Sequence, residues 1–278
     1  MPLPTPQQKI RSEYRIISQL IDEVKQNGNE EMQQLVEKWR REVVLLFAQT
    51  DKLDPLAVES LKAQLQQVSD AVHEQLYKTL TDNQRRLFIK GIQTVDRILK
   101  SGDVRAAVPY LNDIKLELLQ RYSAEHITGI TDLARKNIST EIDLAVLGQK
   151  PVSDIISAIG RDLNGPSVFG NISRRARVIY QTETNRIHNI AAADRMKQLV
   201  GQVPDLKKQW LHHHIGVPRA GHLALNFDTI GVTARYKLIG ADGTIYEIDE
   251  PQDPSLPVSE VVNCHCTIRP VVGRFEEK

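Results

Sequence analysis

Both cysteines of the 278-residue chain lie in one short stretch near its end, VSEVVNCHCTIRP, where a single histidine separates Cys264 from Cys266. A disulfide at this spacing is strained and closes almost no loop, so we do not expect one. Two thiolates on one face of a strand or turn could instead bind zinc together with His222 or a member of the His212–His214 run. The remaining interpretation is two small buried cysteines that pack as apolar side chains.

The same histidines raise the question of an enzyme, namely a metal-dependent hydrolase or nuclease. Catalytic zinc needs three protein ligands, an open coordination position and usually a general base close by. The chain offers ligands in His212–His214 and His222, but it contains no HExxH element, glycine-rich phosphate loop or nucleophile elbow. We therefore expect a protein that is not an enzyme, with the hydrolase or nuclease as the alternative.

The composition is typical of an ordinary globular protein, with 41% hydrophobic residues, 26% charged residues and a formal net charge of +1. So small a charge produces no overall field that would draw the chain to DNA or to an anionic membrane. The longest apolar run, Val43–Ala48, is too short to span a bilayer, and the first residues lack the apolar core of a signal peptide. We expect a soluble protein of a reducing cytoplasm, without a membrane partner.

The first half of the chain predicts a series of helices that pack through apolar stripes. Apolar residues recur every three or four positions in five segments: 10–24, 32–46, 58–76, 88–99 and 127–145. We expect helix breaks or starts at four places: Asn27-Gly28-Asn29, Asp54-Pro55, a capping box of Thr81 with Gln84, and Ser123. The stripes indicate the core of a helical bundle, with a long exposed docking helix as the alternative.

Residues 1–122 carry no spacing typical of a catalytic or metal site, so we assign them as a helical docking region. Residues 123–278 form the second predicted domain, with helices over 123–200 and a β-rich end over 208–272. In that end, alternating residues on both sides of Ala241–Gly243 predict a hairpin, and CTIRPVV predicts a final strand. The expected fold class is therefore α+β, mostly helical and ending in a short antiparallel sheet.

Three arginines, Arg174, Arg175 and Arg177, stand near the start of a helix expected from about Ser173. Between residues 161 and 197, seven residues are basic and three are acidic. Such an excess of positive charge could contact the phosphate backbone of DNA. A solvated helix face, or one that binds a protein partner, has the same composition, so both interpretations stand.

Taken in order, several short motifs resemble the head-morphogenesis domain of tailed phages, which is the Mu F-like family of minor head proteins. The resemblance covers about residues 125 to 272. The matching residues are Arg175 with Ala176, Thr182 with Glu183, Trp210, Arg219 and His222 spaced R-x-x-H, Asp253 with Pro254, and Asn263-Cys264-x-Cys266. The segment GQKPVSDIISAI is similar to the helix that usually precedes them.

The chain departs from the family pattern at two positions that matter for a metal site. Ile215 stands where family members usually carry an acidic residue, and His265 stands where they usually carry arginine. If the family's residues form a metal site, His222, Cys264 and Cys266 are the candidate ligands here. The fourth ligand then stays open between His214 and Asp228.

The resemblance implies a structural component of the phage prohead. Expected partners are the portal protein, the major capsid or scaffolding protein, and packaged double-stranded DNA. The expected location is the capsid interior near the portal in the virion, and the host cytoplasm during assembly. Zinc is the one cofactor that the resemblance and the cysteine spacing suggest.

Overall fold

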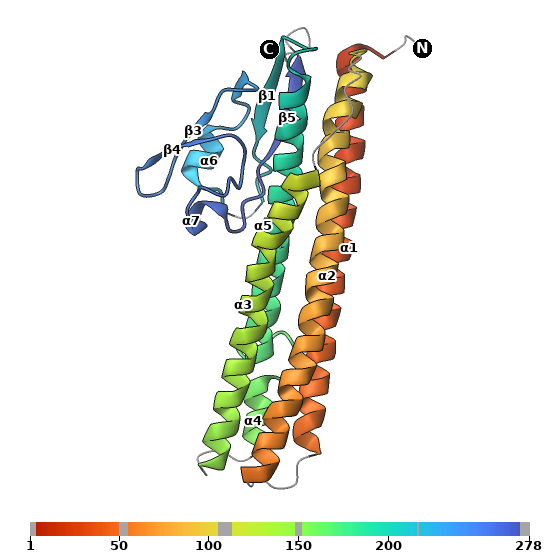
Figure 1. Cartoon of the computed structure of the whole chain (residues 1–278). Helices are drawn as coiled ribbons and strands as arrows, with labels where there is room; N and C mark the ends of the chain where they lie inside the picture. Colours follow the sequence, from red (N-terminus) through yellow and green to blue (C-terminus); the bar gives the residue numbers. More distant parts are fainter. Residues whose placement is uncertain (1–3, 50–54, 105–112, 148–151, 216, 273–278) are drawn as a thin grey trace. The chain divides into compact units, whose positions relative to one another are not determined.

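The computed structural model describes residues 4–49, 55–104, 113–147, 152–215 and 217–272. Its helices are α1 (Pro6–Ala48), α2 (Pro55–Ser101), α3 (Asp113–Val146), α4 (Val152–Ile159), α5 (Val168–Leu199), α6 (Ala220–Ala224) and α7 (Val258–Val261). Its strands are β1 (Leu206–Leu211), β2 (Thr229–Gly231), β3 (Tyr236–Ile239), β4 (Ile245–Ile248) and β5 (Thr267–Val272). The long helices and the small antiparallel sheets confirm the predicted α+β class (Figure 1). No helix in the described ranges combines the length and the apolar character that a membrane crossing requires.

The chain divides into two compact units, and each unit draws on separate parts of the sequence. Unit 1 comprises Met1–Gln26, Asn83–Leu119 and Gln181–Lys278, and unit 2 comprises Asn27–Asp82 and Gln120–Tyr180. The boundary predicted between residues 122 and 123 falls inside α3, and residues 1–122 contribute to both units. Their role in docking stays a prediction.

Unit 2 is held together by the apolar stripes of its helices. Trp39 of α1 is fully buried and meets Phe169 of α5 edge to face, with ring centroids 5.2 Å apart. Around this pair lie Val43, Leu65 and Ile138, all buried in the same core. The interpretation of these stripes as an internal helical core is therefore confirmed for unit 2.

Several predicted helix boundaries are wrong, because the helices run on through them. α1 is continuous across Gly28, and α2 is continuous across Thr81, whose hydroxyl donates to the carbonyl oxygens of Tyr77 and Lys78 instead of capping a new helix. A glycine or threonine inside a helix costs about 1 kcal/mol or less, which burial of the flanking apolar residues outweighs. Ser123 likewise lies within α3, and α5 begins at Val168 instead of near Ser173.

Other predicted boundaries agree with the structure. Pro55 is the first residue of α2. The hairpin is present as β3 and β4, which pair antiparallel, and Gly243 in its turn has a φ of 81°. The predicted cap at Asp54 lies outside the described residues.

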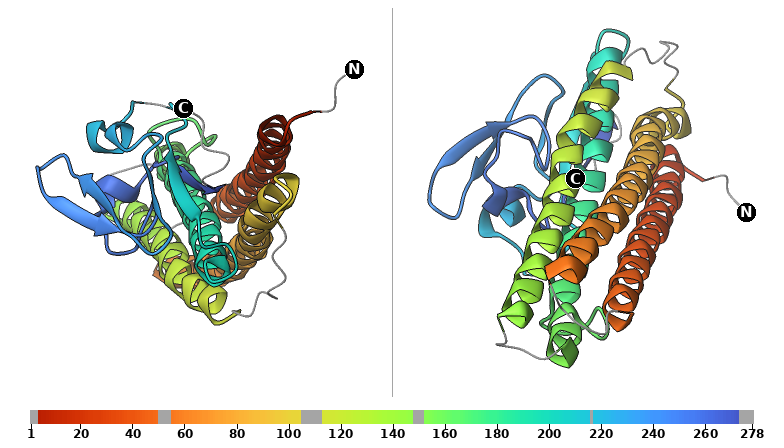
Figure 2. Two further views of the ribbon diagram at one scale, coloured as in Figure 1. Left: turned by 90° about the horizontal axis from the view of Figure 1, so that it is seen from above. Right: turned by 60° about the horizontal axis from the view of Figure 1, so that its bottom comes forward.

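Unit 1 contains a three-stranded antiparallel sheet of order β2-β1-β5, which we call sheet A. Trp210 of β1 stands opposite Ile268 of β5, and both are buried with Met196 of α5 on one face of the sheet. On the other face, the Arg269 guanidinium lies 5.6 Å from the centre of the Tyr14 ring of α1. Sheet A is thus covered by α5 on one side and by the first turns of α1 on the other (Figure 2).

The β5 edge of sheet A is closed to further strand pairing at two successive outward-facing positions. The Ile268 N–H donates to the Asn189 side chain at 3.3 Å, and Pro270, two residues on, has no N–H to offer. Proline is tolerated in a sheet at such an edge position because no ladder hydrogen bond is lost there. This explains how a proline can stand inside the predicted final strand.

His188 of α5 gives unit 1 a predictable sensitivity to acid. Its buried side chain lies 3.3 Å from the Thr94 hydroxyl, and burial together with the charge of Lys25 lowers the pKa of His188 to about 3. The folded imidazole stays neutral, whereas the unfolded one binds a proton below about pH 6.5, so stability falls as the pH drops through this window. Between pH 6.5 and pH 4 we expect unit 1 to lose about 3 kcal/mol of unfolding free energy.

The measurement is urea unfolding at several pH values, followed by the fluorescence of Trp210 in a Trp39→Phe background. The two tryptophans lie in different units, so this signal reports on unit 1. His188→Gln should flatten the pH profile, and the control His126→Gln on α3 should not. An unchanged profile in His188→Gln would contradict the assignment.

Candidate metal centre

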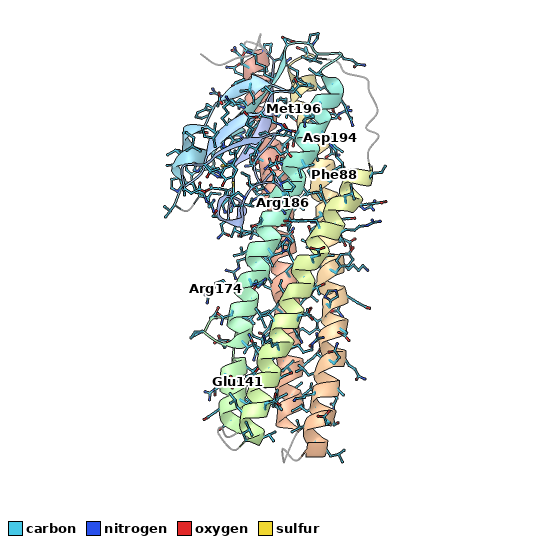
Figure 3. All side chains as sticks on the ribbon, turned by 60° about the vertical axis from the view of Figure 1, so that its left-hand side comes forward. Phe88, Glu141, Arg174, Arg186, Asp194 and Met196 are labelled. Carbon is cyan, nitrogen blue, oxygen red and sulfur yellow. The ribbon has the colours of Figure 1, made fainter. Side chains whose placement is uncertain are left out.

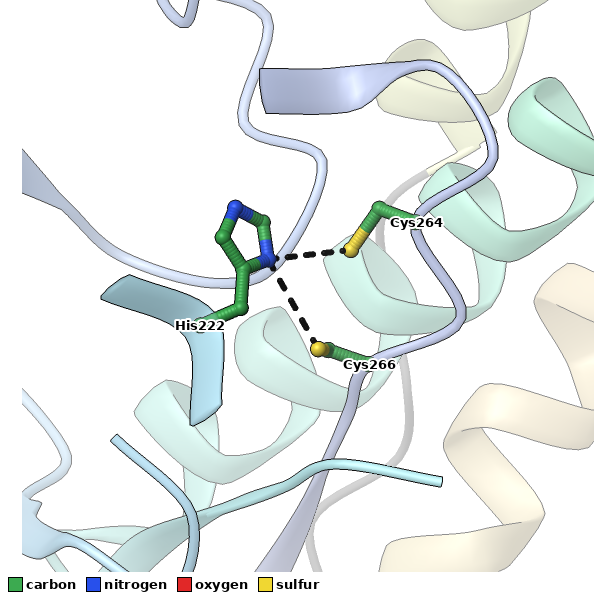
Figure 4. A group of neighbouring side chains, drawn as sticks. All are labelled: His222, Cys264 and Cys266. Atoms are coloured by element: carbon green, nitrogen blue, oxygen red, sulfur yellow. Dashed lines mark hydrogen bonds between the residues drawn. The ribbon is translucent and has the colours of Figure 1, made fainter. Parts of the chain in front are cut away.

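Three predicted ligands from distant parts of the sequence meet in unit 1. His222 lies on the short helix α6, Cys264 lies between α7 and β5, and Cys266 directly precedes β5. The Nδ1 atom of His222 is 3.4 Å from the Cys264 sulfur and 3.7 Å from the Cys266 sulfur (Figure 4). All three side chains are 2% exposed, and their candidate ligand atoms lie within 4.8 Å of one another.

The separations agree with those of a tetrahedral metal site. With Zn–S of about 2.3 Å and Zn–N of about 2.0 Å, a tetrahedral centre places sulfur and nitrogen about 3.5 Å apart. The two observed distances, 3.4 and 3.7 Å, lie on either side of this value. The group could therefore hold a metal ion with little movement of its side chains.

Glu260 of α7 orients the imidazole of His222. The Nε2 atom of His222 is 3.1 Å from the Glu260 carboxylate, so Nε2 carries the proton and Nδ1 directs its lone pair toward the sulfurs. Histidines that bind metals usually donate their other ring N–H in this manner, which fixes the tautomer and strengthens the ligand. The second Glu260 oxygen accepts the Ala241 N–H at 3.1 Å. Glu260 was not among the predicted site residues, although it stands four residues before Cys264.

The two thiols are electrostatically different. The hydrogen bond from Cys266 lowers the pKa of Cys264. The hydrogen bond to Cys264 and burial both raise the pKa of Cys266. A divalent metal ion that binds both sulfurs would displace their protons.

Side chains from α5 fix the backbone of residues 264–266, which we call the cysteine segment. Asn185 donates to the Cys264 carbonyl at 3.1 Å, and Asn189 donates to the Cys266 carbonyl at 3.0 Å. Gln252, in a left-handed conformation with φ 58°, adds a 2.7 Å bond to the Cys264 carbonyl. These residues were not predicted. The i, i+4 spacing of the two asparagines on a helix was the one signal in the sequence that both face the same partner.

Gly221, directly before His222, allows α6 to pack against the hairpin. A Cβ atom at this position would collide with the carbonyl oxygen of Ile239 in β3. Only glycine permits this close approach, which sets the distance between the backbone beside His222 and the hairpin.

The residues of the sequence resemblance surround the same centre. Trp210 meets the His222 ring edge to face at 5.8 Å, and Arg219 donates to the Val262 carbonyl at 2.6 Å. Asn263 is exposed and has a left-handed backbone conformation with φ 55°, so its contribution is a turn of the backbone directly before Cys264.

The threonine-glutamate pair of the resemblance lies on α5, outside the group of three candidate ligands. Thr182 and Glu183 of α5 are both buried, and the Glu183 carboxylate accepts two bonds from Arg186 at 2.6 and 2.7 Å. Arg186, labelled in Figure 3, in turn donates to the Gln252 carbonyl at 3.0 Å, and the Gln252 side chain donates to the Cys264 carbonyl. Glu183 therefore supports the centre indirectly, through Arg186 and Gln252.

No fourth side-chain ligand is in place among the described residues. Neither His214, which is exposed, nor Asp228 belongs to the group of three. A hollow of about 20 Å³ is lined by the three candidate ligands themselves and by His212, His213, His214 and His265, among other residues. That volume accommodates about one water molecule.

Arg174, Arg175 and Arg177 are not part of this centre. They lie on α5 within unit 2, where all three are exposed (Figure 3 labels Arg174).

Comparison with known proteins adds one partial relative. No family description matches the chain, and no solved structure matches it. The chain is 34% identical over 97 residues to the uncharacterized protein YqbB of Bacillus subtilis strain 168. The match covers 33% of this chain and 31% of YqbB, so the chain spans less than a third of that relative.

We expect the purified protein to contain one metal ion per chain, with zinc as the candidate that suits this donor set. His222→Ala and Cys264→Ser should abolish binding, because each removes a ligand. Glu260→Gln should weaken binding about 10- to 100-fold, because it removes the partner that orients His222. Elemental mass spectrometry on protein prepared without a histidine tag measures this, and His73→Ala in unit 2 is the matched control.

Melting with and without a chelator provides the second measurement. A structural metal ion contributes directly to folding, so the chelator should lower the melting temperature of the wild type and leave Cys264→Ser unchanged. Absence of metal, together with a melting temperature that the chelator does not alter, would mean that packing and S–H···N hydrogen bonds hold the three side chains.

Proposed function

We propose that this chain is a structural minor head protein of a tailed phage or prophage. In this proposal it associates with the portal and the inner capsid surface during prohead assembly and during DNA packaging or delivery. A zinc ion bound by His222, Cys264 and Cys266 ties the last strand of unit 1 to the segment between Trp210 and His222. The portal protein and the major capsid or scaffolding protein are the proposed partners, and the capsid interior is the proposed location.

One observation carries this proposal. Residues that define the resemblance to the Mu F-like family, scattered from Thr182 to Cys266, gather around a single buried centre in unit 1. Short motifs that match a family only by chance have no reason to meet in space. Their convergence supports both the family assignment and a common structural task.

The burial of the three ligands favours a structural role over hydrolysis. The ligands are almost fully buried, and the adjoining hollow of about 20 Å³ is too small for a substrate. Glu260 is engaged on the far nitrogen of His222, where it cannot activate a water on the metal. The three side chains leave one position of a tetrahedral ion to a water molecule or a further ligand, and the hollow at that position has room for about one water molecule and not for a substrate beside it.

The proposal predicts that the protein co-purifies with the portal ring and is present in proheads of the parent phage. Cys264→Ser, which disrupts the centre, should be depleted from proheads, whereas His73→Ala should be incorporated as the wild type is. Mass spectrometry of purified proheads measures this. Wild-type protein that is absent from proheads and does not bind the portal would refute the proposal, and metal-dependent nuclease activity would favour the alternative.

A second candidate function, contact with packaged DNA, rests on the arginines of α5. Arg174, Arg175 and Arg177 are exposed, and none of them forms an ion pair with another described residue. Exposed guanidinium groups without carboxylate partners can bind phosphate groups irrespective of sequence. This would be a modest, salt-sensitive interaction in addition to the structural role.

Replacement of the three arginines by glutamine should weaken retention of double-stranded DNA and make it less dependent on salt. Each phosphate contact contributes about 0.9 to the slope of log affinity against log salt concentration, so loss of three contacts should lower the slope by about 2 to 3. Binding titrations from low to moderate salt measure the slope. Arg235→Gln in unit 1, which removes one exposed positive charge elsewhere, should leave the slope almost unchanged. Equal slopes for wild type and triple variant would exclude this face as a DNA contact.

A further inference from the structure

Unit 1 contains an open cavity of about 650 Å³ that shares no residue with the metal centre. It lies between the first turns of α1, the end of α2 and the face of sheet A opposite α5. Its volume is within the range of about 300 to 1,000 Å³ that is usual for sites of small organic ligands. The cavity has no role in the function proposed above.

Arg269 is the polar group that gives this cavity a chemical preference. Its Nε atom donates to the Gln209 side chain at 2.8 Å, and its guanidinium lies 5.6 Å from the Tyr14 ring centre. These two contacts fix the plane of the group. Among the described residues, no acceptor bonds to its two terminal nitrogens. A fixed guanidinium with both terminal nitrogens available matches a carboxylate or phosphate group in two-pronged geometry.

The remaining lining has the character expected around an anion with an apolar body. Arg11 and Lys207 add positive charge, and no aspartate or glutamate is present among the described lining residues. Ile10, Ile98 and Val271 supply apolar surface close to the charged groups. An isolated inorganic ion would leave this apolar surface in contact with water, whereas an organic anion would cover it.

We propose that this cavity binds an organic carboxylate, with the carboxylate on Arg269 and an apolar body against α1 and α2. Two sources present this chemistry: the terminal carboxylate of a peptide that ends in apolar residues, and a fatty acid. The proposal does not depend on the role in phage heads.

The test measures binding by calorimetry with two pairs of probes. The first pair is the acetylated tripeptide Ac-Leu-Leu-Val with a free carboxyl terminus and the same tripeptide with a terminal amide. The second pair is decanoate and decanol. We expect at least one carboxylate to bind and its uncharged counterpart to bind about 10- to 100-fold more weakly, as for loss of a charge-assisted hydrogen bond. The probe that binds better identifies the source.

Arg269→Gln should cause a similar loss of carboxylate affinity. Arg269→Lys should cause a smaller loss, because lysine keeps the positive charge but lacks the two parallel N–H donors of the guanidinium group. Arg235→Gln, an exposed arginine of unit 1 outside the cavity, is the matched control and should bind as the wild type does. Unchanged melting temperatures will show that the Arg269 variants are folded. Failure of both carboxylates to bind, equal binding of a carboxylate and its uncharged counterpart, or wild-type affinity in Arg269→Gln would each overturn the proposal.

Discussion

The burial of a polar stretch of α5 is the constraint on which the rest of unit 1 depends. From Thr182 to Asn189, seven of the eight residues are polar or charged, and all eight are buried. Buried polar groups cost free energy unless they find hydrogen-bond partners, so the surrounding chain must supply those partners at defined positions. The partners are the carbonyl groups of Gln252, Cys264 and Cys266 and the N–H of Ile268. The cysteine segment and the start of β5 can therefore supply the hydrogen-bond partners of α5 in only one position.

The arrangement of the metal centre follows from that requirement. Because α5 fixes the backbone on both sides of His265, the two cysteine side chains leave the same short segment toward His222. On the opposite side, Glu260 and the close packing at Gly221 fix the imidazole. A ligand set held from two directions before metal binds loses little conformational entropy on binding.

The sequence predicted those parts of the structure that leave a periodic or local signal. The apolar stripes, the hairpin around Gly243 and the last strand each have a characteristic spacing, and each is present. The expected breaks at Gly28 and Thr81 were wrong because local preferences of about 1 kcal/mol or less compete with the burial of whole helix faces. His222 and the two cysteines could be identified as a group by residue type and by the family resemblance. Glu260 and Gln252 could not, because the groups they bond to are distant in the sequence, and the spacing of Asn185 and Asn189 indicated a shared partner without identifying it.

The edge of sheet A has a consequence for behaviour at high local concentration. A free strand edge is a template on which identical chains can stack, and a confined compartment with many copies of one protein would promote such stacking. Here the Asn189 side chain occupies one outward position of β5, and Pro270 removes the donor at the next. Contacts between copies of this chain at the β5 edge must therefore use side-chain surfaces, which can dissociate and rearrange, instead of continuous backbone pairing, which could not easily be reversed.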